Sequence, residues 1–115
     1  MAVRADFNSY NDGYTFLDFY PDERRLRVTD DPEVPGYDHP FSVSFYWDGD
    51  KLEHGQREFV GIEIADIRRL HDEDLRAVAY LDLPLVDIPD RGLYKVSVAD
   101  VLRKARDRTL VSTVD

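Results

Sequence analysis

With 115 residues, 43% of them hydrophobic and 12% aromatic, the chain is long and apolar enough to fold as one domain around a packed core. It has no cysteine, which excludes disulfides and thiolate metal sites, and its net charge of −9 disfavours binding to nucleic-acid phosphates. A signal peptide and a membrane-spanning apolar run are both missing, so we expect a cytoplasmic protein. We treat residues 1–115 as a single domain, with 1–13 as a polar lead-in and 109–115 as a loose tail.

Two β-strands and a tight turn are predicted directly after the polar lead-in. Residues 14–20 (YTFLDFY) are rich in the β-branched and aromatic residues that favour a strand. Residues 21–24 (PDER) suit a type I turn, and residues 25–29 are predicted to return as a second strand paired with the first. Asp18 is then a cross-strand partner for one of the arginines of the second strand. The residues of the second strand expected to face the core are Leu26 and Val28.

A second hairpin is predicted in the middle of the chain. Residues 30–40 hold three prolines and a glycine, which favours a loop. Residues 41–47 (FSVSFYW) alternate strictly between apolar and polar side chains, and residues 58–64 (EFVGIEI) alternate in the same way. We expect these two strands to pair through a loop of about ten residues.

The last third of the chain predicts helices. Residues 67–70 suit one helical turn, and the acidic run at residues 72–74 suits the N-terminus of a following helix. A fifth strand over residues 77–83 is the alternative, because that stretch also alternates. Pro84 and Pro89 limit residues 85–88 to an edge strand or an extended crossing. A final amphipathic helix is predicted over Val98 to Arg108. Ser97, with Asp100 three residues later, is its expected N-terminal cap.

Together these elements predict an α+β fold. The predicted sheet has four mostly antiparallel strands from two hairpins, and one or two helices cover one of its faces.

Acidic residues and tyrosines are the features that bear most on function. Residues 30–54 carry seven carboxylates against Lys51 alone. Tyrosine is favoured at interfaces, and five of the tyrosines are too many for one core: Tyr10, Tyr14, Tyr20, Tyr37 and Tyr46. We therefore predict a non-enzymatic interaction module that binds a basic protein partner. The residues predicted to bind that partner are Asp30, Asp31, Glu33, Tyr37, Asp38, Tyr46, Asp48 and Asp50.

Two other classes of function stay open. The sequence has no glycine-rich phosphate loop, no nucleophile elbow and no zinc-protease motif, so we assign no catalytic residue, cofactor or metal. A ligand- or metal-binding domain, or a minor enzyme, is one alternative, and it would use His71 with nearby carboxylates such as Glu63. Asp18 and Glu63 are also a possible carboxylate pair on adjacent strands. The other alternative is homo-oligomerisation through a free sheet edge or the last helix.

Two segments carry a resemblance to a known family. Residues 59–64 (FVGIEI) resemble the final strand of a family of small bacterial β-rich domains of unknown function, whose pattern there is V-V-G-I-E-I-L. Residues 10–17 are similar to the opening pattern of that family, so the resemblance covers about residues 10–70. It implies a compact antiparallel sheet without catalytic residues, and some members are thought to act as the antitoxin-like partner of a small basic toxin.

Overall fold

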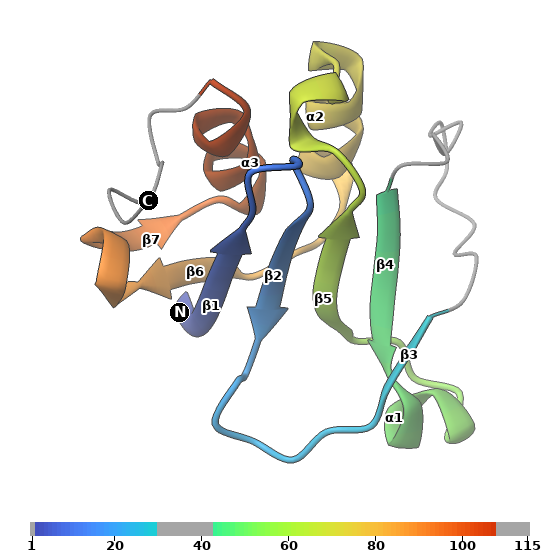
Figure 1. Ribbon diagram of the computed structural model, residues 1–115. Coiled ribbons are helices and arrows are strands. Elements are labelled where there is room, and N and C mark those ends of the chain that lie inside the picture. The colour runs from blue at the N-terminus through green and yellow to red at the C-terminus, as the bar shows by residue number, and fades with distance from the viewer. Residues whose placement is uncertain (1, 30–42, 108–115) are drawn as a thin grey trace.

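The computed structural model describes residues 2–29 and 43–107, which form a seven-stranded mixed sheet with helices on one face (Figure 1). The strand order is β3-β4-β5-β2-β1-β6-β7, and only the β1–β6 pair is parallel. The strands are β1 (Ala2–Ser9), β2 (Thr15–Phe19), β3 (Arg27–Thr29), β4 (Val43–Asp48), β5 (Phe59–Ile64), β6 (Leu85–Ile88) and β7 (Leu93–Val96). The α+β class is confirmed, whereas four strands understate the sheet.

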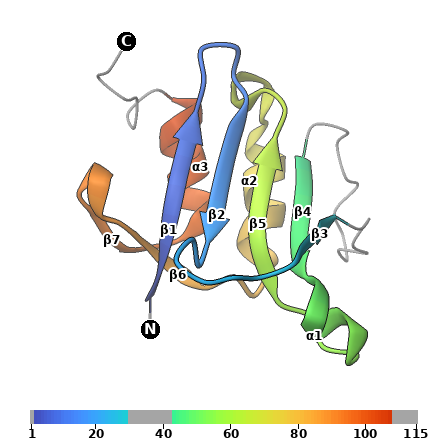
Figure 2. The ribbon, with the colours of Figure 1, turned by 60° about the horizontal axis from the view of Figure 1, so that its bottom comes forward.

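The predicted polar lead-in is wrong, because most of it is β1, close to the middle of the sheet. Ala5 and Phe7 point into the core, while the polar residues that alternate with them, Arg4, Asp6 and Asn8, lie on the other face. β1 pairs with β2 on one side and with β6 on the other (Figure 2). The N-terminal strand therefore joins the two halves of the sheet.

The predicted pairing of the first two strands is also wrong. β2 lies between β1 and β5, so neither of its edges is free, and β3 pairs with β4 instead. Leu26, predicted to face the core, is 56% exposed and lies over Gly49. The strand over residues 14–20 itself is confirmed, since β2 covers Thr15–Phe19.

The second predicted hairpin is confirmed, because β4 pairs antiparallel with β5. The connection between them contains a short helix, α1 (Gly49–Glu53), that the sequence analysis did not predict. Ile62 and Ile64 are buried in the core on the helix-covered face, as their alternation predicts. Val60 is also fully buried, but a register shift between Tyr46 and Trp47 interrupts the alternation, and Phe59 packs against the core as well. Residues 30–42, which include the predicted proline loop, and the predicted tail at 109–115 lie outside the described residues.

The helices η1 (Ile67–Arg69), α2 (Asp72–Tyr80) and α3 (Val98–Arg106) lie on one face of the sheet, where α3 contacts both η1 and α2. A further short helix, η2 (Pro89–Arg91), forms the β6–β7 connection instead. The helix at residues 72–80 is confirmed over the alternative strand, and residues 85–88 form a strand inside the sheet rather than at its edge. Ser97 caps α3 by accepting a hydrogen bond from the backbone of Asp100. The buried face of α3 consists of Val98, Val101, Leu102 and Ala105, which completes the core.

The β1–β2 turn is fixed to η1 through Gly13. Its φ of +92° suits glycine, and a Cβ here would come within 2.1 Å of the Asp66 carboxylate. Asp66 accepts a hydrogen bond from the backbone N–H of Arg68, and Arg68 donates to the carbonyl oxygen of Asp12. The turn and the start of the helical layer are therefore one unit.

Candidate functional site

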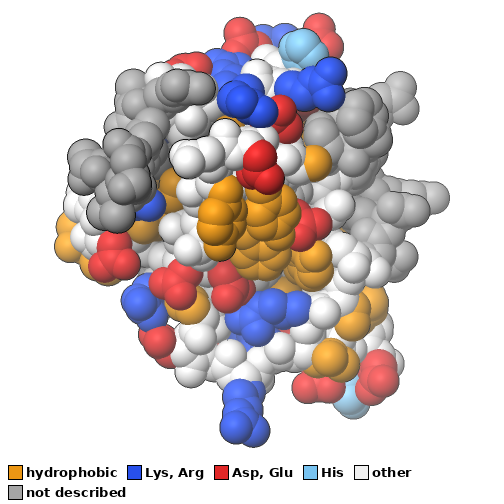
Figure 3. Space-filling view, in the orientation of Figure 1, with side chains coloured by type: hydrophobic (Ala, Val, Ile, Leu, Met, Phe, Trp, Pro, Cys, Tyr) orange, Lys and Arg blue, Asp and Glu red, His pale blue; other side chains and the backbone are white. Residues whose placement is uncertain are grey.

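The face of the sheet opposite the helices carries aromatic and acidic side chains from three neighbouring strands. Phe16 on β2 lies opposite Glu63 on β5, and Gly61 lies between Asp18 and Tyr46 in the same cross-strand register. None of the described helices covers this face. Figure 3 shows hydrophobic side chains gathered over the centre of the sheet, with carboxylates around them.

The centre of this face is a group that we name the Glu63 cluster, formed by Tyr14, Phe16, Tyr46 and Glu63. The Tyr14 hydroxyl donates to Oε2 of Glu63 at 2.5 Å, and the Tyr46 hydroxyl donates to the same oxygen at 3.4 Å. The rings of Phe16 and Tyr46 are 5.4 Å apart, and all four side chains are half-buried. Two hydroxyls therefore orient one carboxylate within an aromatic surface.

Gly61 makes room for the aromatic part of this cluster. A Cβ at this position would lie 3.3 Å from Cζ of Phe16, which is tighter than an ordinary contact. The absence of a side chain on β5 lets the Phe16 ring lie across the sheet toward Tyr46.

The electrostatics of the cluster keep both phenols protonated. The hydrogen bond to Glu63, together with burial, raises the pKa of Tyr14 to about 12. Burial and then the charge of Glu63 also raise the pKa of Tyr46. Among the described residues, no Lys or Arg lies within ion-pair distance of Glu63. This carboxylate is thus held by hydroxyl groups and not neutralised by a cation.

Asp18, the next carboxylate on this face, is arranged differently. Nε of Arg27 donates to it at 2.8 Å, so the predicted arginine partner is present. The predicted cross-strand geometry is wrong, because β3, which carries Arg27, is not adjacent to β2. Asp6 on β1 lies directly opposite Asp18. Burial raises the pKa of Asp18 and Asp6 adds to this effect, while Arg27 opposes it. Asp18 and Glu63 lie on adjacent strands but are not directly opposite each other, and only Asp18 has its own cation.

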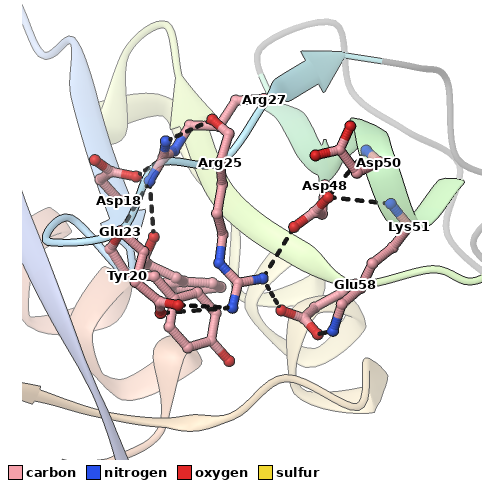
Figure 4. A network of polar contacts seen from close by, with 10 residues as sticks. Asp18, Tyr20, Glu23, Arg25, Arg27, Asp48, Asp50, Lys51 and Glu58 are labelled. Carbon is pink, nitrogen blue, oxygen red and sulfur yellow. Dashed lines mark hydrogen bonds and ion pairs between the residues drawn. The ribbon is translucent and has the colours of Figure 1, made fainter.

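A second polar group lies at one end of the sheet, beside α1 (Figure 4). We name it the Arg25 network, and it consists of Arg25, Asp48, Lys51 and Glu58. Nη1 of Arg25 donates to Asp48 at 3.0 Å and also to Glu58, and Nζ of Lys51 donates to Glu58 at 2.5 Å. Both of its carboxylates are therefore neutralised by the chain's own cations.

The Arg25 network has a structural role. Oδ1 of Asp48 accepts hydrogen bonds from the backbone N–H groups of Asp50 and Lys51, and so caps α1. These bonds, chiefly the one from Lys51, and the charge of Arg25 lower the pKa of Asp48. Burial alone would raise the pKa of Glu58, but Lys51 and Arg25 outweigh burial and lower it.

The predicted partner-binding residues have four different outcomes. Asp30, Asp31, Glu33, Tyr37 and Asp38 lie outside the described residues, so their role stays a prediction. Tyr46 is part of the Glu63 cluster. Asp48 is only 6% exposed and has both oxygens engaged, so its surroundings suit a helix cap. Asp50 is exposed in the first turn of α1.

Sequence patterns alone did not assign Tyr14 or Phe16 to a site, and they gave Glu63 only to the alternative ligand site with His71 and to a possible pair with Asp18. Tyr14 was singled out as one of the tyrosines in excess of the core. What it lacked was the strand order that brings β2, β5 and β4 side by side.

His71, the basis of the alternative ligand site, is exposed at the N-terminal cap of α2. Its backbone N–H donates to Oδ2 of Asp74 at 2.9 Å. Within residues 2–29 and 43–107, no three side chains of His, Asp or Glu are grouped in a way that could hold a metal ion. None of the helices in these ranges has the length and apolar character needed to cross a bilayer.

Comparisons with family models, with curated proteins and with solved structures find no match to this chain. The Glu63 cluster is therefore interpreted from its own geometry.

Proposed function

We propose that the protein is a non-enzymatic interaction module that binds a basic protein partner through the Glu63 cluster. The observation that carries this proposal is the half-buried Glu63 carboxylate, which two tyrosine hydroxyls orient and which has no cation among the described residues. A lysine or arginine of the partner would supply the missing positive charge.

The aromatic rings around Glu63 support a basic side chain as the ligand. A cation over an aromatic face gains about 0.5–2 kcal/mol, and the flat guanidinium of arginine also pairs with a carboxylate. Phe16, Tyr14 and Tyr46 place such faces next to Glu63. One partner side chain can therefore contact a ring and the carboxylate together.

The net charge of the chain, −9, favours the same kind of partner. A field of this sign speeds the approach of a basic protein and weakens as salt is added. The acidic residues 30–38 contribute to the total, and whether they contact the partner remains a prediction. The antitoxin-like role implied by the family resemblance is one form that this binding would take, and the cytoplasm is the compartment we expect for it.

The test uses an arginine- and lysine-rich peptide as the probe and a glutamate-rich peptide of equal length as the control. We expect NMR shift changes at Phe16, Tyr46 and Glu63 with the basic peptide only, and an affinity that falls as salt rises. Glu63→Gln keeps the size of the side chain and an oxygen acceptor but removes the charge. It should weaken binding about tenfold, the effect of losing one charge-assisted contact.

Glu73→Gln is the matched control, because Glu73 is exposed on α2 and loses the same charge. If both variants weaken binding equally, the attraction is due to net charge alone and the proposed site is wrong. Homo-oligomerisation remains the alternative prediction, and β7 is a free edge of the described sheet. The mass in solution tests it.

A further inference from the structure

A pocket of about 500 Å³ lies at the end of the sheet, between the ends of β2, β4 and β5 and the α2–β6 connection. Its size falls within the range of small-molecule sites. The residues that line it are Tyr20, Trp47, Arg57, Glu58, Phe59, Asp82, Leu83 and Pro84. None of them belongs to the Glu63 cluster, so the pocket is a separate feature.

Four half-buried side chains form the apolar walls of the pocket: Tyr20, Phe59, Leu83 and Pro84. Trp47 is almost completely buried behind them, and its ring stacks on Phe59 at 4.2 Å between centroids. These walls join the hydrophobic core, against which Tyr20, Phe59 and Leu83 pack. The pocket thus offers a firm apolar surface to a ligand.

Tyr20 holds its place in the wall in a strained conformation. Its φ of +58° is in the left-handed region, which costs a residue with a side chain free energy. Three hydrogen bonds maintain it: its N–H donates to Arg4, and its carbonyl accepts from Glu23 and Arg27. The Arg25 guanidinium covers its ring at 4.0 Å from the centroid. Strain that is maintained in this way often accompanies a binding site.

Three charged side chains line the pocket, and they differ in whether a described residue of the chain already forms an ion pair with them. Glu58 is already engaged by Arg25 and Lys51. Arg57 is exposed and lies over the Trp47 ring at 5.4 Å, and Asp82 is exposed at the end of α2. Within the described part of the chain, neither Arg57 nor Asp82 has an ion-pair partner. The pocket therefore presents one available cation and one available carboxylate, which do not neutralise each other.

We infer that this pocket binds a free amino acid with an apolar side chain, in its zwitterionic form. Arg57 receives the ligand carboxylate, Asp82 receives its ammonium group, and the side chain packs against Tyr20, Phe59 and Leu83. A ligand with only a positive charge would be repelled by Arg57, and a ligand with only a negative charge would be repelled by Asp82. A ligand that carries both charges on one apolar body complements all three parts of the pocket.

The test compares three probes that share one ring: L-phenylalanine, 3-phenylpropionate and phenethylamine. Trp47 is the single tryptophan of the chain, so its fluorescence reports binding at the pocket. Calorimetry in parallel detects binding that leaves the emission unchanged. We expect L-phenylalanine to bind about tenfold more tightly than either probe that has one charge, because each of those lacks one charge-assisted contact.

Two variants identify which residue meets which charge. Arg57→Gln should reduce L-phenylalanine binding to the level of phenethylamine, and Asp82→Asn should reduce it to the level of 3-phenylpropionate. Arg24→Gln and Asp90→Asn remove the same charges from exposed positions that do not line the pocket, and they should leave binding unchanged. The inference is overturned if L-phenylalanine shows no binding by either method, or if one of the singly charged probes binds as tightly.

Discussion

The Arg25 network and the Glu63 cluster are both built around glutamates of the same β5 region, yet they have opposite partners. Glu58 meets two cations of its own chain, whereas Glu63 meets two tyrosine hydroxyls. A carboxylate that the fold neutralises contributes to the structure of the fold. One that the fold orients without neutralising it is available to a cation from outside. The partners of a charged group, rather than its mere presence, therefore distinguish the two roles.

The largest effect on stability that separates the two groups should come from Arg25→Ala, which removes the central cation of the Arg25 network. Asp48 and Glu58 would lose a shared cation in a place where the Arg25 and Asp48 side chains are only 15% and 8% exposed. We expect the free energy of unfolding, measured with urea, to fall by about 3 kcal/mol. Arg24→Ala, at the exposed neighbouring position, should change it by less than about 0.5 kcal/mol. Equal losses in the two variants would show that the network is not structural.

The second largest effect should come from acid, which weakens the Arg25 network. The folded pKa values of Asp48 and Glu58 lie below their ordinary values of 3.8 and 4.5. Their contribution is therefore complete above pH 4.5 and is lost as the pH falls through the folded values. Urea midpoints measured over an acidic pH series should fall in the parent protein and change less steeply in Arg25→Ala. Parallel curves would contradict this assignment.

The Glu63 cluster should respond at the other end of the pH scale. Because the folded pKa of Tyr14 is about 12 against an ordinary 10.0, its contribution to stability is complete below pH 10 and is lost as the pH rises toward 12. In Glu63→Gln the ultraviolet absorbance of the phenolate should develop at lower pH. The free energy of unfolding at neutral pH should fall by only about 1 kcal/mol. An unchanged alkaline titration would refute the link between Tyr14 and Glu63.

The smallest effect separates the two tyrosines of the cluster. Tyr14→Phe removes a bond of 2.5 Å, and Tyr46→Phe removes one of 3.4 Å. We expect losses of about 1 kcal/mol and less than about 0.5 kcal/mol in the free energy of unfolding, because long hydrogen bonds are weak. Urea unfolding of both variants tests this order, and the reverse order would mean that Tyr46 is the main support of Glu63.

Local sequence patterns predicted the elements in which burial on one face leaves a regular spacing of apolar residues. The alternation of residues 58–64 and the apolar spacing of residues 98–105 describe β5 and α3 well, because burial on one face imposes a period. β1 shows the same alternation at Ala5 and Phe7, but its polar neighbours suggested a lead-in. β6 and β7 are four residues long, too short to show a period.

Strand order, and with it the candidate site, depends on contacts that are distant along the chain. The turn at Pro21 indicated a hairpin, but β1 and β5 occupy both edges of β2. Tyr14 and Glu63 are 49 positions apart, and they meet because β2 lies beside β5. No spacing rule joins such residues, so the chemistry of Tyr14 and Glu63 was visible in the sequence while their contact was not.

The parallel pairing of β1 with β6 has a consequence for synthesis. β1 leaves the ribosome before β6 and keeps one side open until residues 85–88 have also emerged. Over that interval the nascent chain exposes a strand edge that other chains can bind. A chain terminated after residue 84 would keep that edge permanently open, and aggregation is its expected fate.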